Sequence, residues 1–444
     1  MFTRRSLYRS VYGGVLPLLG ALLPGSLNCA AAQATAPLSG VWDATVRVGA
    51  IEVPFEFGIF VKGDQASGWF FNGEQKVVSS SGSFTDHHLV LRFDSYAKKL
   101  DAQLGVDGKL EGVYAVTTEG STAPPVAFHA QRANPKAGDA QPSIPSIAGQ
   151  WLIPTQSAKS GENAWRLIVR QSGAQVSAAI LRVDGDTGAL TGRWQDGKLL
   201  LSHFDGARPA LIEVRPGENG NLQLTLHNSN GTDVPLTAYR QAQASAQGLP
   251  DAADPANHTS VKNPQEPLQF SFPDLSGQII SNTDPRFRGK VVLVDISGSW
   301  CPNCHDEAPF LQAMYRKYRG RGLEIVTLNF EDSPEQLAHP ARLRAFIKDF
   351  GIQYIVLQAG TTQQLHDKLP QAVNLDAYPT TFFIGRDGLV RGAHAGFAAP
   401  ATGDFNAELK KSFAAQIERL LAEKAPAKVA TTAVPVRDLP AARR

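Results

Sequence analysis

The chain has few cysteines, almost no net charge and no long apolar run, and each shortage excludes a class of protein. Three cysteines in 444 residues are too few for a scaffold that is held together by structural disulfides. A net charge of +2 with scattered basic residues provides no stripe that attracts nucleic acid. No apolar stretch has the roughly 20 residues of a membrane-spanning helix, so we expect no transmembrane segment in the mature chain. A chain of 444 residues is also too long for one ordinary core, which favours two or three domains.

Residues 1–34 have the pattern of a removable export signal. A cationic start, an interrupted apolar stretch and a small-x-small cleavage site follow one another: Arg4, Arg5 and Arg9, then 11–23, then Ala32-Gln33-Ala34. The mature chain is expected to begin near Thr35 and to act in the periplasm or cell envelope, and the arginine pair also resembles a twin-arginine signal. Cys29 lacks the neighbours of a lipid attachment site, so it is expected to leave with the signal rather than carry an anchor.

Residues 35–240 are typical of short strands joined by tight turns. The turn dipeptides combine Asn or Asp with Gly, which tolerate positive φ: Asn72-Gly73, Asp107-Gly108, Asp184-Gly185, Asp196-Gly197, Asn219-Gly220 and Asn230-Gly231. The region also repeats at an offset of about 110 residues, where 38–42, 82–86 and 127–132 match 147–151, 192–196 and 236–240. The pattern predicts two tandem antiparallel β-units, small barrels or sandwiches, at 35–134 and 146–241.

Aromatic and imidazole side chains in the two units indicate packing rather than a metal site. Trp42 and Trp151 open the two repeats and are expected to be core residues. The histidines lie singly or as one adjacent pair without acidic or cysteine partners at ligand spacing: His87, His88, His129, His203 and His227. Three further segments lack apolar periodicity. We expect connectors at 135–145 and 242–266, the second flexible or semi-extended, and a disordered tail at 424–444.

From residue 267 to 423 the pattern changes to alternating strands and helices, which predicts an α/β domain with a partly parallel sheet. Strands are expected at 291–296, 323–330, 354–357, 380–384 and 389–393. Helices are expected at 307–318, 342–350, 362–368 and 406–421. The whole chain is therefore predicted to be a multidomain protein with two β-units followed by one α/β domain.

The first strand of this domain leads into Trp300-Cys301-Pro302-Asn303-Cys304, the strand–Cys-x-x-Cys–helix arrangement of thioredoxin-like redox sites. A disulfide between the two cysteines would stabilise the fold little, because the loop that it closes is so short. A zinc site is also disfavoured, because zinc needs four ligands and the pair supplies two. A cysteine at a helix N-terminus has its pKa lowered to roughly 3.5–7.5. Cys301 is therefore predicted to be the attacking thiolate and Cys304 the resolving thiol.

The segment 267–423 resembles the TlpA/ResA-type branch of the thioredoxin superfamily. Four stretches carry the resemblance: 272–277 with 287–294, the Trp-Cys-Pro-Asn-Cys motif, Glu307 with Pro309, and 378–384 followed by Asp387-Gly388. The Pro302-Asn303 dipeptide departs from members that place Pro directly before the second cysteine, so the reduction potential stays open within roughly −270 to −120 mV.

The resemblance also implies roles for residues around the cysteine pair. Glu307 occupies the position of the acid that this branch uses, and Asp295 matches the buried acid of thioredoxin itself, so both are candidates for exchanging the proton of Cys304. Pro379 is expected to be cis, so that the backbone of Tyr378 can pair with a substrate. Trp300 and Thr380 complete the predicted substrate-binding set: Trp300, Tyr378, Pro379 and Thr380.

These observations predict an exported thiol-disulfide oxidoreductase that reduces protein disulfides. Its expected partners are protein thiols or disulfides and an upstream membrane or periplasmic reductant, with no cofactor, metal or nucleic acid. One alternative is a thiol peroxidase of the redoxin type, although its usual Pro-x-x-x-Thr-x-x-Cys setting is absent. Another is an envelope binding protein, in which the β-units hold a partner and the thioredoxin-like domain serves as a redox sensor.

Overall fold

The computed structural model describes residues 38–118, 121, 123–133 and 144–424. The predicted signal with Cys29, most of the first connector and the tail beyond Lys424 lie outside the described residues. All of the described residues belong to one compact unit. Among the described helices, none combines the length and apolar character needed to cross a bilayer.

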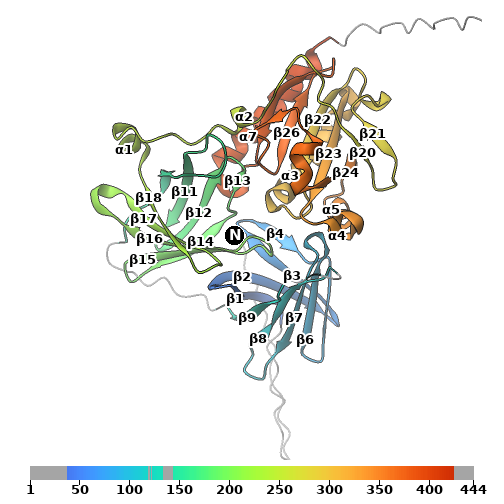
Figure 1. Ribbon diagram of the computed structural model, residues 1–444. Helices are drawn as coiled ribbons and strands as arrows, with labels where there is room; N and C mark the ends of the chain where they lie inside the picture. Colours follow the sequence, from blue (N-terminus) through green and yellow to red (C-terminus); the bar gives the residue numbers. More distant parts are fainter. Residues whose placement is uncertain (1–37, 119–120, 122, 134–143, 425–444) are drawn as a thin grey trace, which may run out of the picture. The chain divides into compact units, whose positions relative to one another are not determined.

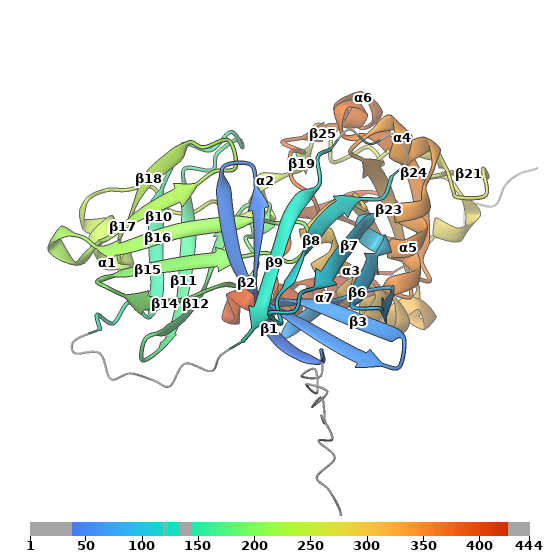
Figure 2. The same ribbon diagram turned by 90° about the horizontal axis from the view of Figure 1, so that it is seen from below.

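Within the described residues, the first β-unit is a sheet of nine strands in the order β2-β1-β9-β8-β7-β6-β5-β3-β4 (Figures 1 and 2). Because β2 also pairs with β3, the sheet closes into a barrel and β4 lies outside the ring. The elements are β1 (Gly40–Val48), β2 (Ile51–Lys62), β3 (Gln65–Asn72), β4 (Gln75–Val78), β5 (Ser81–Thr85), β6 (His88–Phe93), η1 (Asp94–Tyr96), β7 (Lys98–Leu104), β8 (Leu110–Val116) and β9 (Val126–Arg132).

The second β-unit repeats this arrangement as a nearly closed sheet. Its path in the described chain is β10-β11-β12-β14-β15-β16-β17-β18, with β13 paired to β12 as β4 is paired to β3. A bridge between Leu152 and Tyr239 brings the two ends of the path together. The elements are β10 (Gly149–Pro154), β11 (Ala164–Ser172), β12 (Gln175–Arg182), β13 (Gly185–Asp186), β14 (Leu190–Gln195), β15 (Lys198–His203), β16 (Ala210–Pro216), η2 (Glu218–Gly220), β17 (Leu222–His227) and β18 (Asp233–Ala238).

The strand-by-strand correspondence confirms the predicted pair of antiparallel β-units. All six Asn-Gly and Asp-Gly dipeptides lie at turns, and their glycines have positive φ. Trp42 and Trp151 are buried, and the indole N–H of each donates to a carbonyl four residues earlier. The aromatic openings of the repeats are therefore core residues, as predicted.

The segment between the β-units and the last domain differs from the expected flexible linker. It contains α1 (Gln241–Ala246), α2 (Pro255–His258) and β19 (Ser260–Val261), the last paired with β25 (Ala372–Val373). His258 is buried and its Nε2 lies 2.6 Å from a carboxylate oxygen of Asp376. Elements of two to six residues are too short for hydrophobic periodicity to reveal.

The last domain is built on a mixed sheet of five strands, β24-β23-β22-β26-β27, among the residues described. β22 is parallel to β23 and antiparallel to β26. The strands are β20 (Ser271–Pro273), β21 (Ile279–Ser281), β22 (Val291–Ser297), β23 (Leu323–Glu331), β24 (Ile355–Thr361), β26 (Thr380–Ile384) and β27 (Val390–Ala395). The helices are η3 (Pro285–Phe287), α3 (Pro302–Tyr318), η4 (Arg319–Arg321), α4 (Pro334–Ala338), α5 (Ala341–Asp349), η5 (Thr362–Gln364), α6 (Leu365–Lys368), η6 (Pro400–Thr402) and α7 (Asp404–Ala422).

Both faces of this sheet are covered, which explains why β22 is buried along its whole length. Val291 and Leu293 pack with α3, α5 and α7 on one face, and alternate residues pack with the β20–β21 hairpin and α6 on the other. Figure 1 shows α3 against the central strands of the sheet. The arrangement confirms the predicted α/β domain of thioredoxin type and places the end of β22 directly before the cysteine pair.

Candidate active site

Cys301 and Cys304 form a disulfide at the start of α3, with Cα atoms 5.2 Å apart. Cys301 is the N-cap of the helix, and its Sγ accepts the backbone N–H of Cys304 at 3.2 Å. Pro302 at the first helical position lacks an N–H that would otherwise need a partner. The Sγ of Cys301 is thus beside the positive end of the helix dipole, where a thiolate is stabilised. Both cysteines are buried in the oxidised form, at 3% and 2% exposure.

The loop before β26 borders the disulfide. Its Tyr378–Pro379 peptide is cis, as the resemblance implied, and the Tyr378 carbonyl oxygen lies 3.5 Å from the Sγ of Cys301. Trp300 packs edge to face against Tyr378 at 5.3 Å and donates its indole N–H to the carbonyl of Phe330. Thr380 is fully buried and its hydroxyl donates to the carbonyl of Ala377. Three predicted substrate residues therefore border the cysteine pair, while the side chain of Thr380 faces the interior.

The two predicted acids are buried on facing elements, Asp295 on β22 and Glu307 on α3. Asp295 accepts a hydrogen bond from the hydroxyl of Thr327 at 2.8 Å, and Glu307 accepts one from Thr381 at 3.2 Å. Thr327 and Thr381 flank Asp295 on the neighbouring strands, so the two acids share one environment. Burial raises the pKa of both acids, and the charge of Asp295 raises that of Glu307 further. A raised pKa makes each carboxyl group a stronger proton acceptor once it is ionised.

A buried ion pair fixes the loop that precedes Cys301. Ser299 is fully buried and its hydroxyl donates to Glu331, which also pairs with Arg342 at 2.6 Å. Arg342 donates to the Ser299 hydroxyl oxygen as well and reaches Asp332. This cluster was not predicted, because its members come from three separate elements and no local pattern connects them. It anchors the backbone of the loop that leads to the nucleophile.

The first turns of α3 also receive contacts from both β-units. The ring of Tyr96 stacks on His305 at 4.2 Å with nearly parallel planes. The N–H of His305 donates to the carbonyl of Ser299 at 2.8 Å, and burial lowers the pKa of this imidazole to about 4. Asp306 accepts hydrogen bonds from Asn72 at 3.4 Å and from Arg208 at 3.0 Å. Sequence reasoning missed all of these residues except the unusual Asn303, which also bonds to Arg208 at 2.7 Å.

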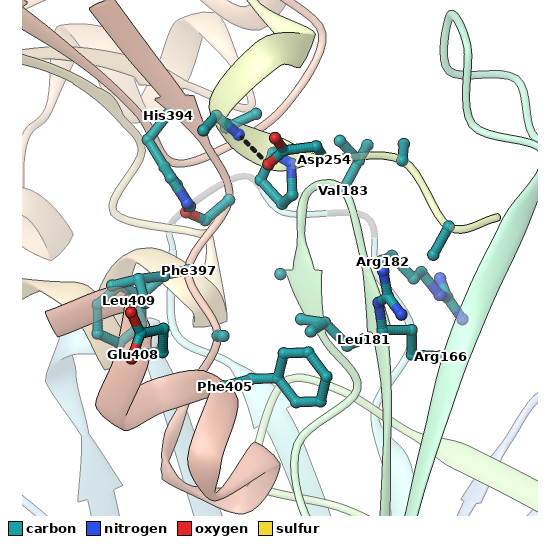
Figure 3. Close-up of a pocket in the computed structure, with 18 of the residues that line it drawn as sticks. Arg166, Leu181, Arg182, Val183, Asp254, His394, Phe397, Phe405, Glu408 and Leu409 are labelled. Atoms are coloured by element: carbon teal, nitrogen blue, oxygen red, sulfur yellow. Dashed lines mark hydrogen bonds between the residues drawn. The ribbon is translucent and has the colours of Figure 1, made fainter. Parts of the chain in front are cut away.

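A pocket of about 290 Å³ lies between β11, β12, α2 and α7 (Figure 3). Its apolar lining includes Leu181, Phe397 and Phe405, and its polar lining includes Arg166 and Arg182. Two glycines, Gly185 and Gly396, also line it. The second of these is tied to the cis-proline loop, because its N–H donates to the carbonyl of Pro379 at 2.7 Å. The pocket is thus adjacent to the loops around the disulfide.

Comparisons with known proteins agree with this local picture. Residues 265–393 match the AhpC/TSA family. The thiol-disulfide oxidoreductase ResA of Bacillus cereus (strain ZK) is 28% identical over 127 residues, which cover 28% of this chain and 65% of that protein. ResA of Bacillus subtilis (strain 168) is 28% identical over 135 residues, which cover 30% of this chain and 68% of that protein. The chain thus spans a little less than two thirds of the first of these relatives. The predicted likeness to ResA-type proteins is confirmed, and it is confined to the C-terminal domain.

Two solved structures are also similar to a part of the chain. A thioredoxin family thiol:disulfide interchange protein from Chlorobium tepidum TLS is 21% identical with a TM-score of 0.28, covering 36% of this chain and 99% of that one. A secreted thiol-disulfide isomerase from Corynebacterium glutamicum is 16% identical with a TM-score of 0.30, covering 39% of this chain and 97% of that one.

Proposed function

We propose that this protein is an exported thiol-disulfide oxidoreductase that reduces disulfides in protein substrates. The observation that carries the proposal is the Cys301–Cys304 disulfide at the start of α3, with the Tyr378 carbonyl 3.5 Å from the Sγ of Cys301. A redox-active pair needs an attackable sulfur, a means of stabilising its thiolate and a backbone group for the substrate. The helix N-terminus would stabilise the thiolate, and the cis-proline loop would offer the backbone group to the substrate.

The proposed reaction proceeds through one mixed disulfide. In the reduced enzyme the Cys301 thiolate attacks one sulfur of the substrate disulfide, so a Cys301–substrate bond forms and the other substrate sulfur leaves as a thiolate. Cys304 then loses its proton and attacks Cys301, which releases the second substrate thiolate. Two electrons pass to the substrate, and the enzyme is left with the Cys301–Cys304 disulfide. A second dithiol, from a membrane or envelope reductant, returns the pair to its reduced state.

Asp295 and Glu307 are the proposed acceptors for the proton of Cys304. Their burial between β22 and α3 and their raised pKa values support this role, because a raised pKa makes a carboxylate a stronger proton acceptor. Trp300, Tyr378 and Pro379 are the proposed substrate contacts, and Thr380 holds their loop through its bond to the Ala377 carbonyl. Export into the periplasm or envelope rests on the N-terminal sequence pattern.

The test is dithiol-dependent reduction of insulin by the mature chain. Cys301→Ser should abolish activity, while Cys304→Ser should accumulate mixed disulfides that a non-reducing gel resolves. Retention of insulin reduction by Cys301→Ser contradicts the proposal. The same preparations should be assayed for peroxide consumption in parallel, because rapid turnover of peroxide without insulin reduction would favour a thiol peroxidase instead.

A further inference from the structure

One arginine of the second β-unit reaches the dipeptide between the two cysteines. Arg208 lies in the connection between β15 and β16, and only 15% of its side chain is exposed. Its Nη1 donates to the side-chain oxygen of Asn303 at 2.7 Å, and its Nη2 donates to Asp306 at 3.0 Å. Its Nε donates to Asp205 at 2.7 Å. The guanidinium therefore joins a carboxylate of its own unit to the first turns of the redox helix.

Several hydrogen bonds hold Asp205 in a fixed position. Asp205 is fully buried and also accepts the backbone N–H groups of Ala207 and Arg208. Burial opposes its ionisation, but the charge of Arg208 and the contact with His203 at 3.4 Å hold the pKa of Asp205 well below its usual range. The loop is thus shaped to present Arg208 as a cation in a fixed position.

Asn303 is held from a second side by the turn between β12 and β13. Its side-chain N–H donates to the carbonyl of Asp184 at 2.9 Å. Gly185 has a φ of +116°, and a Cβ at this position would lie 2.5 Å from the Asn303 nitrogen. Only glycine permits this conformation together with so close an approach. Both ends of the Asn303 amide are therefore used by the second β-unit, which gives a physical reason for Asn at this place in the motif.

Reduction of the disulfide creates a negative charge beside these groups. The Cys301–Cys304 bond breaks, two electrons enter, and Cys301 is left as a thiolate at the N-cap of α3 while Cys304 takes up a proton. A positive charge near the first turn of α3 stabilises that product, and a negative charge destabilises it. Arg208 and Asp306 are the two opposite charges that contact one another at this point.

We propose that Arg208 of the second β-unit is a positioning residue that sets the reduction potential of the Cys301–Cys304 pair through Asn303 and Asp306. The proposal deepens the redox function above and rests on it. It makes the second β-unit part of the redox site, because the charge that biases the thiolate comes from outside the thioredoxin-like domain. Arg208 favours the reduced form, and Asp306 opposes it.

The experiment is redox equilibration of the full mature chain with glutathione, followed by alkylation of free thiols and separation on a gel. Two glutathione thiols supply the electrons and end as one glutathione disulfide. Arg208→Gln should lower the equilibrium constant for reduction about tenfold, which is about 30 mV for this two-electron couple. Asp306→Asn should raise it severalfold, and the double variant should return to within about threefold of the parent.

Two further variants separate a charge effect from a loss of structure. Arg208→Lys keeps the charge but loses the forked geometry, so its equilibrium constant should stay closer to the parent than that of Arg208→Gln. Arg215→Gln removes an exposed arginine that pairs with Glu213 in the same unit, and it should leave the potential unchanged. Shifts of the same sign in Arg208→Gln and Asp306→Asn, or no shift beyond twofold in either, overturn the proposal. Because no protein substrate is used, a chain that fails to reduce insulin can still pass this test.

Discussion

The two β-units share a strand order but make different contacts with the redox helix. The turn between β3 and β4 corresponds to the turn between β12 and β13, and the β6–β7 connection corresponds to the β15–β16 connection. All four reach the first turns of α3. The first unit contributes Asn72 and Tyr96, while the second contributes the Asp184 carbonyl and Arg208.

The difference lies in the chemistry of the corresponding loops. The first unit offers a stacked aromatic ring and a long amide hydrogen bond, neither of which carries charge. The second unit offers a buried cation with its own buried carboxylate. A repeated scaffold has thus supplied equivalent places for contact, and the charged side chain that bonds directly to the first turns of α3 comes from the second unit. Contact alone therefore does not make a unit part of the chemistry.

Removing the contacts that each β-unit makes with α3 should give the largest difference in the free energy of unfolding. Arg208→Ala leaves Asp205 buried without its partner, so the free energy of unfolding should fall by about 3–5 kcal/mol. Tyr96→Leu loses only a ring stack and should cost about 1–2 kcal/mol. Urea denaturation followed by circular dichroism measures both, with Arg215→Ala as an exposed ion-pair control that should change stability by less than about 1 kcal/mol. Equal losses for Arg208→Ala and Tyr96→Leu would remove the distinction between the units.

His305 tests the contact made by the first unit. Burial lowers its pKa to about 4 from an ordinary 6.5, so the unfolded state binds the proton more readily. The associated stability is present above pH 6.5 and is lost as pH falls through about 4, by about 3 kcal/mol. His305→Gln keeps a donor for the Ser299 carbonyl but does not titrate, so its stability should vary less over this window. Parallel denaturation curves at several pH values measure the effect. An unchanged pH profile in the variant would contradict the assignment.

The strands, the turns and the cysteine pair were predictable because their signals are local. Asn72-Gly73 and Asp184-Gly185 indicate turns through the φ that glycine tolerates, and the Trp300 to Cys304 motif is contiguous. The contacts with α3 were not predictable. Asn72 and Asp306 are 234 residues apart in sequence, and their meeting depends on how whole elements pack.

The partners of three histidines could not be found from spacing along the chain. His88, His129 and His227 each lie beside a carboxylate across a strand pair or a turn: Asp101, Glu111 and Asp233. Spacing along the chain cannot register such pairs, since strand pairing brings them together. Asp295 was the opposite case, because an acid inside an apolar strand is conspicuous in the sequence itself.

Asp295 differs from Asp205 and Asp306, because it lies on the central strand β22 and bonds to Thr327 of the neighbouring strand rather than to Arg208. Burial raises its pKa to about 7, so its stabilising contribution is complete below about pH 4 and is lost as pH rises through 7. Asp295→Asn should therefore raise the free energy of unfolding by about 2–4 kcal/mol at pH 8 and by little at pH 4. The same variant should slow insulin reduction, because Cys304 loses an acceptor. A variant equally stable to the parent at both pH values would contradict this account.

The smallest expected effect tests where the two units are alike. Arg132 lies over Trp42 at 4.5 Å and Arg240 lies over Trp151 at 3.7 Å, and each arginine also donates to a backbone carbonyl near the start of its repeat. Arg132→Ala and Arg240→Ala should each lower the free energy of unfolding by about 1–2 kcal/mol, with values within about 0.5 kcal/mol of one another. Thermal and urea denaturation measure the pair. Equal losses would mean that the units differ only in the loops that meet α3. A gap above about 1 kcal/mol would instead place the asymmetry in the barrels themselves, and the charge on Arg208 would then be one difference among several.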